Sequence, residues 1–150
     1  MKLIHYGSNR FEKDKFKPIR NPQQYFNKPC GGLWTCPINL EWGWKEFGEQ
    51  IGRSNMDKSF ELILDSDKIL EIYSEYSAQD LPMIEFDTPD FYSHNQTLDF
   101  EALAKEYDAL HMPEFAMEST DDLPYEFYGW DVETVLIFNP DVIKLHHEIY

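Results

Sequence analysis

Three residues with chemically useful side chains lie far apart in the chain, each at the edge of an apolar run. His5 closes the first apolar run, Trp34 follows a glycine pair and a leucine, and Glu133 opens the apolar run near the C-terminal end. An imidazole can hydrogen-bond a hydroxyl group, and a flat aromatic ring can stack on a ligand ring. A carboxylate can stabilise positive charge that develops in a reaction. The three side chains therefore predict a site, provided that the fold brings them together.

The stretch Cys30–Pro37 is the one around which we expect that site to form. Glycine accepts backbone conformations that other residues resist, and it lets a ligand approach the main chain closely. We therefore expect Gly32 to contact the ligand beside Trp34, and Thr35 to add a hydroxyl contact.

Short segments must position these residues. Alternating or continuous apolar residues predict strands, and apolar residues at spacings of three and four predict helices. We expect helices at Ile38–Ile51, capped by Asn39 and ended by Gly52, and at Leu98–Tyr107, capped by Thr97. The expected strands are Lys2–Tyr6, Leu33–Thr35, Ser59–Leu64, Lys68–Ile72, Ala109–Met112, Thr134–Phe138 and Val142–Leu145.

Several further patterns complete the secondary-structure prediction. Asp65-Ser66-Asp67 is expected to be the turn joining the strands on either side of it. Residues 80–84 are expected to form a turn or a short helical stub. Trp42 and Trp44 are interpreted as packing residues.

Few helices and many short strands predict an α+β fold. At 150 residues the chain is expected to form a single domain, residues 1–150, with a sizeable core. Hydrophobic residues make up 42% and aromatic residues 16%, so disorder of the whole chain is excluded and a largely aromatic core is expected. The glycine-rich motifs of the common nucleotide-binding folds, GxGxxG and GxxxxGK[ST], are absent from the sequence.

Charge divides the chain unevenly. The net charge is −15. Residues 1–50 carry eight Lys/Arg and five Asp/Glu, while residues 51–150 carry five and twenty-three. The acidic part disfavours direct binding to nucleic acid or to an anionic membrane. The basic N-terminal part can attract a phosphorylated small molecule.

Two cysteines, Cys30 and Cys36, are too few for a disulfide framework, and free thiols are expected. They are not accompanied by a His/Cys cluster suited to zinc, and the pair His146-His147 is expected to face opposite sides of a strand, so no metal site is predicted. We see no signal peptide and no apolar run long enough to span a membrane, so a cytoplasmic protein is expected.

The order of these motifs resembles the ADP-ribosyltransferase superfamily, in its His–aromatic–Glu branch. His5-Tyr6-Gly7-Ser8 is similar to the family's first motif, Gly31-Gly32-Leu33-Trp34-Thr35 to its second, and Glu133-Thr134-Val135-Leu136-Ile137 to its third. The resemblance spans nearly the whole chain, although each motif is short. The family members that the chain resembles are small, mostly uncharacterised phage and bacterial proteins.

The resemblance implies split antiparallel sheets of short strands with a few helices. It also implies cleavage of the bond between nicotinamide and ribose in NAD, a consumed substrate, and transfer of ADP-ribose to a protein or another macromolecule. Glu133 would stabilise the oxocarbenium-like transition state, Trp34 would stack on the nicotinamide ring, and His5 would bond a ribose hydroxyl on the adenosine side.

Two departures from the family pattern leave alternatives open. Tyr6 stands between His5 and Gly7, so a shifted alignment places Tyr6 at the His position. Asp131 lies two residues before Glu133 and competes for the carboxylate role.

Two further interpretations compete with the enzyme. A domain of net charge −15 can imitate nucleic acid and act as a non-enzymatic inhibitor that binds a basic partner. An inactive fold relative would keep Trp34 and Glu133 without turnover. The enzyme itself is expected to act in phage–host conflict, an expectation that rests on the resemblance alone.

Overall fold

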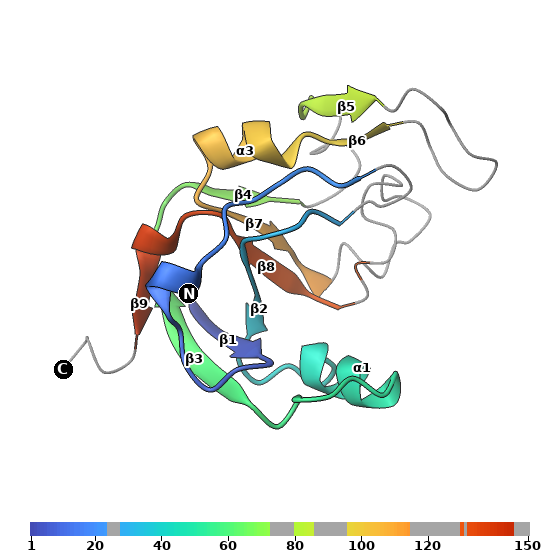
Figure 1. The fold of residues 1–150 in the computed structure, drawn as a ribbon, viewed down its shortest axis with the longest axis vertical. Helices are drawn as coiled ribbons and strands as arrows, with labels where there is room; N and C mark the ends of the chain where they lie inside the picture. The colour runs from blue at the N-terminus through green and yellow to red at the C-terminus, as the bar shows by residue number, and fades with distance from the viewer. Residues whose placement is uncertain (24–27, 73–79, 86–95, 115–129, 131, 146–150) are drawn as a thin grey trace.

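The structure is a computed structural model, and it describes residues 1–23, 28–72, 80–85, 96–114, 130 and 132–145. Within these residues the chain forms short strands and two short α-helices, an α+β arrangement (Figure 1). The elements are β1 (Lys2–Tyr6), β2 (Leu33–Pro37), α1 (Trp44–Gln50), β3 (Ser59–Leu64), β4 (Ile69–Glu71), β5 (Met83–Glu85), β6 (Gln96–Leu98), α3 (Phe100–Glu106), β7 (Ala109–Met112), β8 (Thr134–Ile137) and β9 (Ile143–Leu145). Single 3-10 turns occur at Lys13–Lys15 and Pro140–Val142.

Seven strands form one sheet in the order β4-β7-β8-β2-β1-β3-β9. Its neighbours are antiparallel except β4 and β7, which run parallel. A parallel pair needs a crossover connection, and α3 lies on the chain between β4 and β7. Strands β5 and β6 form a separate two-stranded ribbon.

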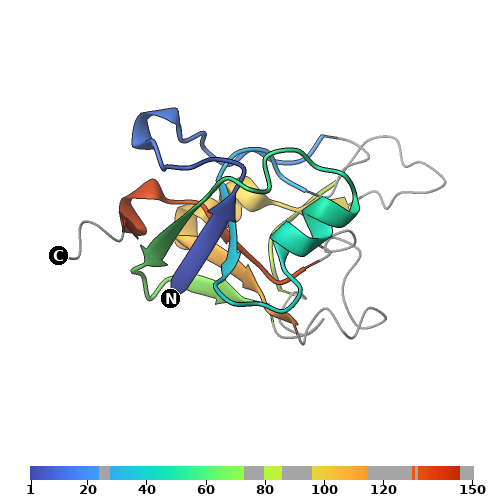
Figure 2. The ribbon, with the colours of Figure 1, turned by 90° about the horizontal axis from the view of Figure 1, so that it is seen from below.

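The sheet curls so strongly that its two halves pack against each other (Figures 1 and 2). One apolar cluster joins Leu3 and Leu62 of the β1–β3–β9 half to Val135 and Ile137 of the other half. A second cluster lies on the other face of β7 and β8, where Phe100 and Leu103 of α3 are buried. Strand β8 is buried at all four positions because it has a core on each face.

Strand β2 is the place where the sheet divides. Its second half pairs with β1, through Cys36 opposite Ile4 and Pro37 opposite Leu3. Its first half pairs with β8, through Leu33, Trp34 and Thr35. Beyond Ile4 the ladder between β1 and β2 ends: His5 and Tyr6 continue to pair with β3, and Leu33–Thr35 pair with β8.

The strand predictions are largely confirmed. Strands β1, β3 and β7 have the predicted bounds. Strands β2, β8 and β9 differ from the prediction by one or two residues at one end, and β4 is one residue shorter at each end. The prediction of a turn or helical stub at residues 80–84 is wrong for its last two residues, because Met83–Glu85 forms β5. The expected pairing across Asp65-Ser66-Asp67 is also wrong, since β3 pairs with β1 and β9 while β4 pairs with β7.

Both predicted helices exist, but they are shorter than expected. Helix α1 begins at Trp44, not Ile38, and Asn39 is not its cap, because Asn39 adopts a left-handed conformation in the preceding turn. The predicted end is confirmed: Gly52 has φ +77° directly after the C-cap residue. Helix α3 is capped by Asp99, whose side chain accepts from the Ala102 N–H, and not by Thr97, which lies in β6.

Among the described residues, no helix is long and apolar enough to cross a membrane.

Candidate functional site

The His5 and Trp34 motifs meet where β1 and β2 separate. Nδ1 of His5 donates to the carbonyl oxygen of Trp34 over 2.8 Å. Because a carbonyl can only accept, this bond places a proton on Nδ1 and leaves Nε2 available for another partner. The bond joins two residues 29 positions apart in the chain, so the fold brings the first two sequence motifs together.

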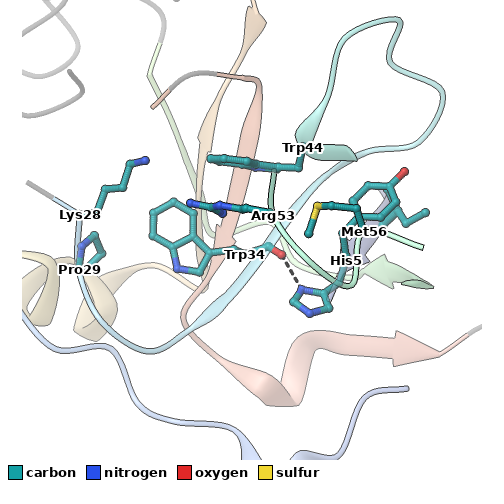
Figure 3. Close-up of a pocket in the computed structure, with 9 residues that line it drawn as sticks. His5, Lys28, Pro29, Trp34, Trp44, Arg53 and Met56 are labelled. Atoms are coloured by element: carbon teal, nitrogen blue, oxygen red, sulfur yellow. Dashed lines mark hydrogen bonds between the residues drawn. The ribbon is translucent and has the colours of Figure 1, made fainter. Parts of the chain in front are cut away.

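An open pocket of about 310 Å³ lies at this junction (Figure 3). Its wall combines the ends of β1 and β2 with α1 and the segment that follows α1. A pocket of this size accepts a nucleoside-sized group. The lining residues are Ile4, His5, Tyr6, Lys28, Pro29, Trp34, Trp44, Arg53 and Met56.

Trp34 is held in this wall by other aromatic rings. Its ring meets Trp44 edge-on at 6.4 Å and Trp130 at 5.0 Å with a tilt of 51°. Trp130 is buried and stacks in turn on Phe100 of α3. This row of rings runs from the pocket into the core, so Trp34 presents a fixed surface to a ligand.

Positive charge gathers at the pocket although the chain as a whole is acidic. The Lys28 ammonium lies 5.6 Å from the centre of the Trp44 ring, and the Arg53 guanidinium lies 5.9 Å from it. Both are cation–π distances. Among the residues that line this pocket, the two charged side chains, Lys28 and Arg53, are both basic, which favours an anionic ligand.

A second hollow, of about 440 Å³, lies next to the pocket, and Trp34 lines both. Gly32 lines it with φ +68°, and a Cβ there would lie 2.9 Å from the Ile137 carbonyl oxygen. Gly32 was predicted to let a ligand approach the main chain, but the close approach in the structure is partly that of the neighbouring strand β8. The hollow is also lined by Arg10, Glu12, Lys15 and Lys17 of the basic N-terminal loop. Glu12 forms ion pairs with Arg10 and Lys15.

Burial controls the ionisation of the β1 residues at the pocket. It lowers the pKa of His5 below its usual value of 6.5, against the smaller opposing effect of the bond to the Trp34 carbonyl. It also raises the pKa of the Tyr6 phenol, with smaller contributions from Cys36 in its ionised form and from the nearby carboxylates of Glu46, Glu49 and Glu61. Near neutral pH the pocket therefore offers a neutral imidazole and a neutral phenol.

Glu133 lies directly before β8, the strand that pairs with β2, but it does not line the pocket. Its carboxylate faces β7, where Oε2 lies 2.8 Å from Nε2 of His111 and Oε1 accepts the Glu114 N–H at 3.1 Å. The next residue, Thr134, accepts a hydrogen bond from the Trp44 indole at 3.1 Å. Glu133 is thus one residue along the chain from a side chain that contacts the pocket wall.

The remaining predicted residues lie in other places. Thr35 is fully buried, and its hydroxyl donates to the Val135 carbonyl over 2.6 Å, so the structure places it between β2 and β8 and not in the pocket. Asp131 and the His146-His147 pair lie outside the described residues. Cys30 is an exposed free thiol and Cys36 a buried one. Within the described part of the chain, no group of three or more His, Cys, Asp or Glu side chains could hold a metal ion.

Sequence reasoning missed several residues of the site. It assigned Trp44 to packing, and the ring does pack edge-on against Trp34 and Phe47, but it also lines the pocket. Arg53 and Met56 gave no signal, because only the fold returns the segment after α1 to the end of β1. His111 did give a usable signal in the sequence, because it is a polar residue within an otherwise apolar strand.

Comparisons with known protein families, with curated proteins and with solved structures found no match to this chain. Its function is therefore inferred from the geometry of the site and from the motifs.

Proposed function

We propose that the chain binds NAD in the pocket between β1, β2 and α1, cleaves the nicotinamide–ribose bond and transfers ADP-ribose to a protein or another macromolecule. The observation that carries the proposal is the His5–Trp34 hydrogen bond at the division of the sheet, beside an open pocket. It unites two of the three motifs that resemble the ADP-ribosyltransferases. The third motif opens β8, the strand next to β2.

The ligand roles follow from the bonds that the residues already make. Trp34 stacks on the nicotinamide, since its ring is held by Trp44 and Trp130. Nε2 of His5 accepts a hydrogen bond from a ribose hydroxyl, because Nδ1 is committed to the Trp34 carbonyl and the lowered pKa keeps the ring neutral. Tyr6, which also lines the pocket, remains the alternative for this role.

The reaction needs a negative charge near the ribose. The C–N bond breaks, the electron pair leaves with nicotinamide, and the ribose carbon becomes oxocarbenium-like until a nucleophile of the acceptor attacks it and loses a proton. Glu133 is the proposed stabiliser of this cation. It does not line the pocket, so this role requires the ligand to extend from the pocket to the start of β8. Asp131 is kept as the second candidate carboxylate.

Charge and sheet geometry support the same proposal. Lys28 and Arg53 on one side of Trp34, and Lys17 on the other, give an anionic diphosphate favourable surroundings in a chain of net charge −15. The division of the sheet at β2 agrees with the split antiparallel sheets that the resemblance implies, so we propose an ADP-ribosyltransferase-like fold.

The test is release of nicotinamide from NAD by the wild-type chain, by Glu133→Gln and by Glu106→Gln, with cell lysate as the acceptor source. Glu106 is exposed at the end of α3, so its variant removes the same charge away from the site. We expect release by the wild type and by Glu106→Gln, and a loss of about 100-fold or more in Glu133→Gln. Labelled lysate proteins would then identify the acceptor.

Other outcomes would favour the competing functions. NAD that raises the melting temperature of the chain without any release would indicate an inactive relative that still binds its ligand. If NAD is not cleaved and does not stabilise the chain, the proposal is contradicted. The acidic charge of residues 51–150 would then favour an inhibitor that binds a basic partner, detected as a tight complex that salt dissociates.

A further inference from the structure

Side chains from β4, from β7 and from the residue directly before β8 form a row of close contacts. Nδ1 of His111, on β7, lies 2.6 Å from Oε2 of Glu71 on β4. Nε2 of the same ring lies 2.8 Å from Oε2 of Glu133. The sequence separates these residues by 22 positions or more, and the curled sheet brings them together.

The backbone holds this row in place. His111 stands in the middle of the β7 ladder, opposite Glu71 on one side and Val135 on the other. Its carbonyl accepts the Ile72 N–H at 3.0 Å. The His111 side chain is 12% exposed and that of Glu133 is 14% exposed, so both have little freedom to reorient.

The two contacts of the His111 ring differ in geometry. The Nε2 contact is a hydrogen bond to Glu133, and because an ionised carboxylate only accepts, Nε2 is its donor. Nδ1 lies at ion-pair distance from Glu71 but has no hydrogen-bond partner among the described residues. Glu71 therefore limits the space in which the ring can turn, without a directed bond to it.

Both oxygens of Glu133 consequently have a donor. Nε2 of His111 supplies one and the Glu114 N–H supplies the other. A carboxylate held at both oxygens loses less orientational freedom when it meets a reacting group, and small misplacements of such groups lower rates strongly. The same arrangement without His111 would leave one oxygen free to turn towards solvent.

We propose that His111 is a positioning residue for Glu133, and that Glu71 holds His111 in its orientation. This inference rests on the proposed function, because the effect of His111 is exerted through Glu133. His111 and Glu71 themselves do not line the pocket.

The test compares His111→Phe, which keeps a planar ring but removes both nitrogens, with His111→Gln, which keeps an amide donor. Nicotinamide release is measured over a range of NAD concentrations, with thermal unfolding of each variant as the control for folding. We expect His111→Phe to lower kcat about 10- to 100-fold while KM for NAD changes less than about threefold. His111→Gln should recover part of the loss, and Glu71→Gln should show a smaller one.

A double variant separates positioning from a general structural effect. In the Glu133→Gln background, His111→Phe should cause little additional loss, because residues that act as a unit are not additive. The inference is overturned if His111→Phe leaves kcat unchanged or raises it, or if its loss is the same in both backgrounds. If His111→Phe does not fold, His111→Gln and Glu71→Gln carry the comparison. No release from the wild type is a different result, which overturns the proposed function and this inference with it.

Discussion

Burial of the His5 ring decides how the protein should respond to acid. Burial lowers the pKa of His5 in the folded state, so the unfolded chain binds a proton more readily. As the pH falls below about 6.5, the usual value for histidine, protonation favours unfolding until His5 is also charged in the fold. The contribution of neutral His5 to the free energy of unfolding is therefore present above about pH 6.5 and is lost progressively below it.

We expect His5→Gln to remove this dependence. Between pH 7.5 and 5.5, the free energy of unfolding of the wild type should fall relative to that of the variant, by at most about 1.4 kcal/mol per pH unit for one proton. Urea unfolding at several pH values measures the difference. A difference that does not change over this range would show that the pKa of His5 is the same in both states.

Trp34 and Trp42 offer a matched pair of indoles. Trp34 lines the pocket, whereas Trp42 is 48% exposed and does not line it. Trp34→Leu should weaken NAD binding about 2- to 10-fold, because a stacked aromatic pair contributes about 0.5–1.5 kcal/mol beyond its buried area. Trp42→Leu should leave binding unchanged, as measured by calorimetry. Equal effects of the two variants would contradict the proposed stacking role.

At the scale of elements, the turn into β2 requires glycine at position 31 both for its backbone conformation and for lack of space, and Gly52 separates these two reasons. Gly31 has φ +78°, and an added Cβ would overlap the Pro18 carbonyl oxygen. Gly52, after α1, has nearly the same φ, but an added Cβ there meets nothing within 4 Å.

We therefore expect Gly52→Ala to cost about 1 kcal/mol, the price of a left-handed alanine. Gly31→Ala should cost clearly more, because the N-terminal loop must also move away. Chemical denaturation of both variants measures the comparison. Equal losses of stability would show that the loop yields without cost.

Local patterns predicted which segments become strands, but not which strands become neighbours. The alternation in Ser59–Leu64 predicted β3 with its correct bounds. The short acidic turn after it suggested pairing with β4, yet β4 pairs with β7, nearly forty residues later in the chain. Turn residues report local chain direction, whereas pairing depends on apolar faces that only the whole sheet defines.

The helix ends show the same limit. The spacing of Leu40 and Trp44 predicted a helix from residue 38, but Asn39 adopts a left-handed conformation that stops a helix. Trp44 instead opens α1 and turns its ring towards the pocket.

One contact between the sequence motifs was also predictable. The glycine and aromatic motif predicted that His5 and Trp34 would meet, and they are hydrogen-bonded. The partnership of Glu133 with His111 could not be predicted, because it depends on the register between β7 and β8. Thr35 was placed at the ligand from its position beside Trp34, but alternation along β2 turns it into the core.

At the scale of the whole molecule, net charge opposes the compact state. A charge of −15 on 150 residues repels itself, and added salt screens this repulsion. We expect the melting temperature to rise between about 10 and 200 mM NaCl, where the Debye length falls from about 30 Å to below 10 Å.

Potassium chloride should give the same rise, since the effect depends on ionic strength and not on the identity of the cation. A melting temperature that falls with salt would show that local ion pairs outweigh the overall repulsion.

The position of β8 in the sheet has a consequence for how the protein is made. This strand lies between β2 and β7, and the bond from Thr35 to Val135 spans 100 residues of chain. While the chain is being synthesised, the N-terminal strands must therefore wait on the ribosome for β8 before the sheet can close. Such distant pairing slows folding. A prematurely terminated chain would carry His5 and Trp34 but neither Glu133 nor β8, so under the proposed function truncated products should be inert.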